Sequence, residues 1–225
     1  MAPFIGFDHF QFTYDVFGPH YQPEKPSIRY LFEDSVPYYR VNSDGTKLAI
    51  NPGSLFWTWE NHDIVDTEFP IPSGGRVHGL LVFATWLAFQ EPQASKRLYI
   101  DKSTMPEIAE DGVLIKVVIG STGQVVNPVE TPEPITFLHV FLSPGKAFKH
   151  VLPTGWNGTF YITTGSVNFA NGTNQYPLEA GSVVSVGLSP NTEDLTFSAE
   201  VESQLILLGG LPQQVAIFRQ ASPTA

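Results

Sequence analysis

The sequence contains no cysteine, which excludes disulfides, thiolate zinc sites and cysteine nucleophiles together. It also lacks a long apolar run: the longest, Gly79 to Phe89, is shorter than the roughly 20 residues that a membrane-spanning helix needs. The opening residues show no basic region followed by an apolar core, so they do not resemble a secretory signal. We therefore expect a soluble, cytoplasmic protein that has no membrane partner.

Positive charge is scarce, because 12 Lys and Arg residues face 22 Asp and Glu residues and the formal net charge is −10. Such a surface repels phosphate backbones, so direct binding to nucleic acid is not expected. The sequence also shows no Ser-His-Asp order, no phosphate-binding glycine loop and no Gly-x-Ser-x-Gly elbow. A small-molecule substrate remains the expected partner, and a protein partner is a further possibility.

Turn-forming residues are plentiful, with 19 Gly and 19 Pro spread evenly through the 225 residues between short β-branched and aromatic runs. This pattern indicates many strands joined by turns, and few windows show helical spacing. We predict an all-β protein built from antiparallel barrels. A polar segment at 90–111 and a weak internal repeat suggest an N-terminal barrel at 1–100, a C-terminal barrel at 101–212 and a tail at 213–225.

Two carboxylates stand one residue apart, Asp66 and Glu68, on the predicted strand 64–69. Because side chains alternate along a strand, these two share one face. If that face lines a barrel, they form a strongly negative pocket in which one of the two pKa values should rise. They would then act as a general acid beside a general base. The alternative is a structural role, in which the two carboxylates are solvated at the barrel mouth.

The collinear order of several segments resembles the pirin family of the cupin superfamily. The segments are a tyrosine-rich strand, an Asp-Gly turn, Pro52-Gly53-Ser54, Ile64-Val65-Asp66-Thr67-Glu68, His78-Gly79-Leu80, Leu142-Ser143-Pro144-Gly145, Pro153-Thr154-Gly155-Trp156 and Leu208-Gly209-Gly210-Leu211-Pro212. The resemblance implies a bicupin, meaning two tandem antiparallel cupin-type β-barrels with little helix. It also implies an iron-type metal site in the first barrel alone, and a chain that begins later and ends earlier than typical pirins.

Carried onto this sequence, the family's metal ligands fall on His20, Gln22, Asp66 and Glu68. Two positions keep the ligand type of the family, whereas an amide and a carboxylate replace the other two histidines. This oxygen-rich set suits manganese or magnesium better than iron. We therefore expect no cofactor, with iron or another divalent metal ion as the alternative.

The leading hypothesis is a pirin-like bicupin enzyme, an isomerase or cyclase of secondary metabolism that acts by metal-independent proton transfer. Its substrate would be a small apolar, polyketide- or flavonoid-like metabolite in the first barrel. The expected catalytic residues are Asp66, Glu68 and His20, and the expected substrate-binding residues are Gln22, Phe56, Trp57, Phe83 and Tyr30. The alternatives are a metal-dependent dioxygenase of the quercetinase type and a non-catalytic, pirin-like transcription cofactor, which would place the protein in the nucleus.

The other histidines receive smaller roles. His78 precedes an apolar strand and fits a packing role, and His139 fits a core or pocket position of the second barrel. His9 lies near a strand end and is assigned no function.

Overall fold

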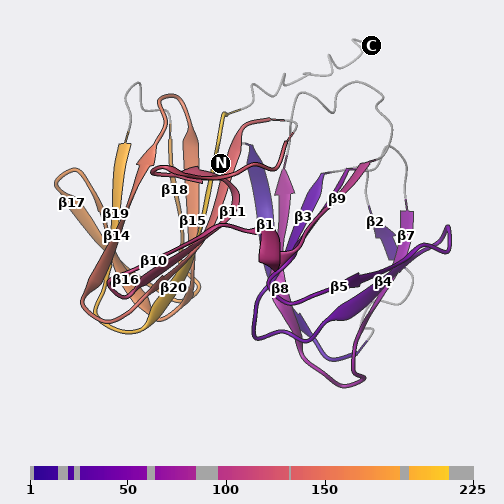
Figure 1. Ribbon diagram of the computed structural model, residues 1–225. Helices are drawn as coiled ribbons and strands as arrows, with labels where there is room; N and C mark the ends of the chain where they lie inside the picture. The colour runs from indigo at the N-terminus through magenta and orange to yellow at the C-terminus, as the bar shows by residue number, and fades with distance from the viewer. Residues whose placement is uncertain are drawn as a thin grey trace, which may run out of the picture.

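The computed structural model describes residues 3–14, 20–22, 26–59, 64–84, 96–131, 133–187 and 193–212. These residues form four antiparallel sheets in two groups that lie side by side (Figure 1), which confirms the all-β fold class. A short 3-10 turn, η2 (Lys102–Thr104), interrupts the strands and is capped by Asp101. Within the described ranges, no helix is long and apolar enough to cross a membrane.

The first group of strands makes a five-stranded sheet and a four-stranded sheet, which enclose the first barrel. The five-stranded sheet runs in the order β1 (Phe4–Phe12), β8 (Val77–Ala84), β3 (Ser27–Leu31), β6 (Leu55–Trp59) and β9 (Lys96–Ile100). The four-stranded sheet runs in the order β2 (His20–Gln22), β7 (Ile64–Pro70), β4 (Tyr38–Asn42) and β5 (Lys47–Ile50).

The second group repeats this plan with a larger sheet. Its first sheet runs in the order β10 (Glu107–Glu110), β11 (Val113–Thr122), β13 (Ile135–Leu142), β20 (Ser203–Gly210), β15 (Asn157–Thr164) and β18 (Val183–Val186), with β12 (Val125–Asn127) paired to β11. The opposite sheet runs in the order β14 (Lys146–Leu152), β19 (Glu193–Ala199), β16 (Ser166–Asn171) and β17 (Asn174–Glu179). The polar segment expected to connect the barrels therefore contributes strands to both.

Strand alternation divides the side chains of the five-stranded sheet between two apolar environments. One face points into the first barrel, where Leu31, Phe56 and Val77 share a cluster. The other face packs on the second barrel through a mixed cluster that includes Trp57 and Phe137. The barrels are thus joined by a continuous core, and the five-stranded sheet separates that core from the first lumen.

Two glycines allow the strands around the first barrel to meet closely. Gly53, at the end of the Asn51-Pro52-Gly53 turn, has a φ of +78°, which favours glycine over residues with a Cβ. At Gly79 on β8, an added Cβ would lie 2.5 Å from the carbonyl oxygen of Tyr30. The absence of a side chain there lets β8 pair with β3 without displacement.

The lumen of the first barrel as candidate functional site

The face of β7 that carries the two predicted carboxylates points into the first barrel. Asp66 is fully buried and Glu68 is 8% exposed, whereas the alternate residues Val65, Thr67 and Phe69 are only half-buried. The structure therefore confirms that Asp66 and Glu68 share an inward face.

Each carboxylate faces an arginine that the sequence analysis did not single out. Arg40, on the neighbouring strand β4, donates from Nε to Asp66 Oδ2 at 2.8 Å and from Nη2 to the same oxygen. With its amide oriented to satisfy both neighbours, Asn42 donates to Asp66 Oδ1 at 2.7 Å. Asp66 is thus held by donors on two sides, in a charge-assisted arrangement.

The second pair crosses the barrel from one sheet to the other. Arg29 on β3 places Nη2 3.3 Å from Glu68 Oε1 on β7, and both side chains are at least nine-tenths buried. Two guanidinium groups therefore balance the two carboxylates. The expectation of a strongly negative pocket is wrong. The arginines that balance the two carboxylates lie on strands that are distant from β7 in the sequence.

The two pairs leave several buried polar atoms unsatisfied. Arg29 Nη1, Arg40 Nη1, Tyr38 OH and Glu68 Oε1 have no hydrogen-bond partner within the described part of the chain. Leaving a buried polar atom unpaired costs about 1–3 kcal/mol, and more when the group is charged. Three donors and one carboxylate oxygen in this state indicate a site that a polar ligand would complete.

Burial dominates the electrostatics of the lumen. It raises the pKa of Asp66, and the charge and hydrogen bonds of Arg40 oppose that rise. This agrees with the expectation that one of the two carboxylates has a raised pKa. Burial also raises the pKa of Tyr38, which remains a neutral hydroxyl able to donate a hydrogen bond.

The aromatic residues predicted to bind substrate divide between the two faces of the sheet. Phe56 lies in the lumen cluster, and Arg40 Cζ sits 5.0 Å from the centre of its ring. Phe83 occurs at a half-buried position of β8, on the face opposite the buried Val82 and Ala84. A cavity of about 240 Å³ reaches Arg40 and Phe56 from the rim of the barrel.

Tyr30 and Trp57 do not line this chamber, contrary to our expectation. Both are fully buried in the cluster between the barrels. The reason is the two-residue period of a strand: Trp57 follows Phe56 directly and so points to the other face. Tyr30 is likewise next to Arg29, whose side chain points inward.

His20 and Gln22 belong to β2, where the backbone of His20 pairs opposite Asp66 and that of Gln22 opposite Ile64. Their side chains lie outside the described part of the structure. Their assignment to the site stays a prediction.

The described residues of the lumen do not fit a divalent metal ion. Among them, no group of three His, Asp or Glu side chains is placed to hold a metal. More directly, Arg40 and Arg29 occupy the positions beside Asp66 and Glu68 that a cation would need, and two guanidinium groups would repel it.

One signal in the sequence could have identified Arg29 and Arg40 as site residues. Each lies inside a strand between apolar or aromatic neighbours, where charged residues are rarely buried unless they are paired. Their partners could not be named, because strand pairing is decided by the fold.

Comparisons with known proteins find similarity to pirins. The family profile described as the Pirin C-terminal cupin domain matches residues 137–220. Pirin-1 of Arabidopsis thaliana is 24% identical over 213 residues, covering 94% of this chain and 73% of that protein.

Solved structures share the fold. A Geobacillus kaustophilus protein superposes with a TM-score of 0.82 at 24% identity, covering 95% of this chain and 85% of its own. A structure named quercetin 2,3-dioxygenase from Acinetobacter baumannii has a TM-score of 0.80 at 20% identity, covering 94% and 75%.

Proposed function

We propose that this chain is a pirin-like cupin whose first barrel binds and isomerises a small metabolite without a metal ion. The observation that carries this proposal is the pairing of both lumen carboxylates with arginines whose Nη1 groups have no hydrogen-bond partner among the described residues. In a cupin barrel, this arrangement puts cationic donors where a metal would otherwise stand.

The lumen chemistry suggests the class of substrate. Phe56 and the apolar residues around it favour a flat, largely apolar molecule. Arg29 Nη1, Arg40 Nη1 and Tyr38 OH would complement an acidic oxygen, such as an enolate, a phenolate or a carboxylate. Polyketide- and flavonoid-like metabolites combine both features.

We assign Glu68 as the base of a proton transfer, because its buried Oε1 has the 3.3 Å ion contact with Arg29 but no hydrogen bond among the described residues. It would take a proton from a carbon next to a carbonyl, and the electrons of the C–H bond would move onto the carbonyl oxygen. The guanidinium groups of Arg29 and Arg40 would stabilise the resulting enolate. Return of the proton to a different atom gives the isomer, while Asp66 positions Arg40.

Metal-dependent oxygenation is the alternative function. An experiment with quercetin distinguishes it from metal-independent isomerisation. We expect the purified protein to bind quercetin, detected by a change in the quercetin absorbance, without taking up oxygen. Tyr38→Phe, which removes a single unpaired hydroxyl, should weaken binding about tenfold, in line with one lost hydrogen bond to a charged oxygen. Lys146→Met, on the surface of the second barrel, is the matched control and should bind as the wild type does.

Stoichiometric metal in the purified protein, together with oxygen uptake that a chelator abolishes, would contradict this proposal. Equal quercetin binding by the wild type and Tyr38→Phe would remove the lumen from consideration as the binding site.

A further inference from the structure

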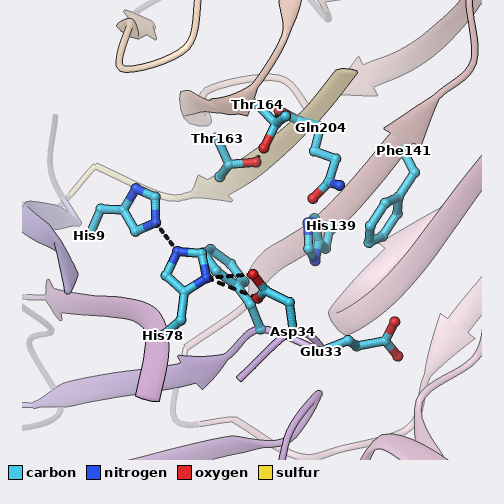
Figure 2. A pocket seen from close by; sticks show the side chains of 10 residues that line it. His9, Glu33, Asp34, His78, His139, Phe141, Thr163, Thr164 and Gln204 are labelled. Atoms are coloured by element: carbon cyan, nitrogen blue, oxygen red, sulfur yellow. Dashed lines mark hydrogen bonds and ion pairs between the residues drawn. The ribbon is translucent and has the colours of Figure 1, made fainter. Parts of the chain in front are cut away.

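A second cavity, of about 270 Å³, lies between the two barrels. Strands β1 and β8 and the residues after β3 supply its walls from the first barrel, and β13, β15 and β20 supply them from the second (Figure 2). It is on the opposite face of the five-stranded sheet from the first-barrel lumen, so it is a separate site.

A chain of hydrogen bonds runs along one wall of this cavity. Tyr161 OH lies 2.6 Å from His9 Nδ1, His9 Nε2 lies 2.6 Å from His78 Nε2, and His78 Nδ1 lies 2.9 Å from Asp34 Oδ1. Arg76 completes the chain by donating to Asp34 Oδ2. The chain links the second barrel to the first through side chains alone.

The direction of one of these bonds follows from its acceptor. The Asp34 carboxylate can only accept, so His78 Nδ1 carries a proton and donates it. His9 links His78 Nε2 to Tyr161 OH, and its tautomer sets which atoms donate in those two bonds. The histidines that we expected to be structural or without function therefore fix the orientation of Asp34.

Asp34 remains able to bind a ligand. Although partial burial acts to raise it, the hydrogen bonds from His78 and Arg76 lower the pKa of Asp34 below its ordinary value, so the carboxylate is ionised. A carboxylate has about four acceptor positions. His78 Nδ1 lies 2.9 Å from Oδ1 and 3.0 Å from Oδ2, and Arg76 donates to Oδ2, so the free position lies on Oδ1. The Asp34 side chain is 52% exposed and faces the cavity (Figure 2).

His139 provides an independent sign of a ligand. It is 2% exposed, and its Nδ1 lies 3.2 Å from Tyr30 OH. Its Nε2 makes no well-aligned hydrogen bond within the described ranges. The side chain of Gln204 stands beside it in the cavity wall (Figure 2). Burial lowers the pKa of His139, and hydrogen bonding to Gln204 acts to raise it against that larger effect. His139 was expected in the core or a pocket of the second barrel, but it faces the first barrel because Leu138 and Val140 occupy the inward positions.

The remaining lining favours an uncharged ring. The charged side chains near the cavity are paired, Asp34 with Arg76 and Glu33 with Lys116, so they leave little net charge for an ionic ligand. Phe141 supplies an apolar ring, 4.2 Å between centres from the His139 ring. At this volume the cavity is smaller than the roughly 300–1,000 Å³ of pockets for drug-sized molecules.

We propose that the cavity between the barrels is a second ligand site, which binds a small uncharged ring that carries two adjacent hydroxyl groups. One hydroxyl donates to the free acceptor position on Asp34 Oδ1. The second hydroxyl lies within reach of Gln204 and His139 Nε2, and the ring packs on Phe141. A catechol and a cyclic aliphatic diol share this chemistry.

Nuclear magnetic resonance with the full chain tests the site, using catechol and cis-1,2-cyclohexanediol as probes and phenol and cyclohexanol as single-hydroxyl controls. We expect the diols to shift the side-chain amide of Gln204 and the methyl groups of Thr163 and Thr164. The single-hydroxyl compounds should bind at least about tenfold more weakly, because one acceptor position stays unfilled. Tighter binding of catechol would identify an aromatic ligand, and tighter binding of cyclohexanediol an aliphatic one.

Asp34→Asn should weaken diol binding at least about tenfold, because a neutral amide replaces the charged acceptor. Asp111→Asn makes the same chemical change at an exposed surface position and should leave binding unchanged. Gln204→Met, which keeps the side-chain size, provides a second variant and should also weaken binding. Tyr38→Phe changes only the first-barrel lumen and should have no effect here.

Absence of shifts with either diol at millimolar concentration would overturn the proposal, as would equal binding by Asp34→Asn and Asp111→Asn. Either result would leave the proposed function of the first barrel unaffected.

Discussion

The two barrels share one architecture but differ in what fills them. The lumen of the first holds four buried charged residues, Arg29, Arg40, Asp66 and Glu68, beside Phe56 and Tyr38. The second is filled by an apolar cluster that includes Phe148, Phe160, Phe169 and Phe197, whose rings pack against one another. One barrel therefore holds buried charged groups, and the other a packed apolar cluster.

The comparison shows that two barrels of one architecture differ through the residues at their inward positions. Buried ion pairs seldom add stability over apolar residues of the same size, because desolvation offsets their attraction. The proposed function gives the buried charges of the first barrel a role that stability alone does not. The four predictions below test this difference, beginning with the largest expected effect.

The first prediction concerns Glu68 as a base. With α-tetralone as the probe in heavy water, we expect the wild type to exchange the hydrogen next to the carbonyl for deuterium. Glu68→Gln should slow this exchange at least about 100-fold, the usual contribution of a general base. Proton magnetic resonance of the probe measures the rate. Equal rates in the two proteins would exclude Glu68 as the base.

The second prediction concerns the buried pair of Arg40 and Asp66. Arg40→Met should lower the free energy of unfolding by about 3–5 kcal/mol, because it leaves the Asp66 carboxylate buried without its partner. Urea unfolding measures the loss. The double variant Arg40→Met, Asp66→Leu should recover most of it, since both charges are then gone. No recovery would mean that these two side chains do not interact as a pair.

The third prediction concerns pH. Burial lowers the pKa of His139 to about 3 and that of His150 to about 4, from an ordinary value of 6.5. Below pH 6.5 the unfolded chain takes up protons at these histidines while the folded protein does not, so stability falls as the pH falls towards the folded values. Each histidine should contribute about 1.4 kcal/mol per pH unit in this window.

Urea unfolding between pH 6.5 and 4 measures how the free energy of unfolding changes with pH. His150→Gln should reduce that slope by roughly the contribution of one histidine. His150 lies in the second barrel, bonded to Thr122. The substitution should therefore leave the exchange of α-tetralone unchanged. An unchanged slope would show that His150 is charged in the folded protein.

The fourth and smallest effect concerns the apolar barrel. Ile162→Val removes one buried methylene from the second barrel and should cost about 0.5–1.5 kcal/mol of stability. We expect no change in exchange activity or in quercetin binding. A loss of activity without a loss of stability would contradict the division of roles between the barrels.

Sequence patterns located several parts of this structure correctly. The strand rhythm predicted an all-β fold, and the alternation of Asp66 and Glu68 predicted one inward face. The same rule could not tell which of the adjacent residues Phe56 and Trp57 points inward, and Trp57 instead fills the core between the barrels. A face becomes inward only when the sheet has a defined partner on each side.

The cavity between the barrels illustrates the same limit. His9, His78 and Asp34 are far apart in the sequence and carry no motif, yet they form one hydrogen-bonded chain. Only the packing of β1 against β8, and of the first barrel on the second, brings them together.

The sequence by itself determined the strands, the missing thiol chemistry, the acidic surface and the shared face of Asp66 and Glu68, because these depend on residue type and on a local period of two. Tertiary structure alone decided that arginines neutralise those carboxylates, that Tyr30 and Trp57 face away from the chamber, and that histidines meet between the barrels. These outcomes depend on pairing between distant strands, and the energy of a buried charge is set by neighbours that the local sequence does not specify.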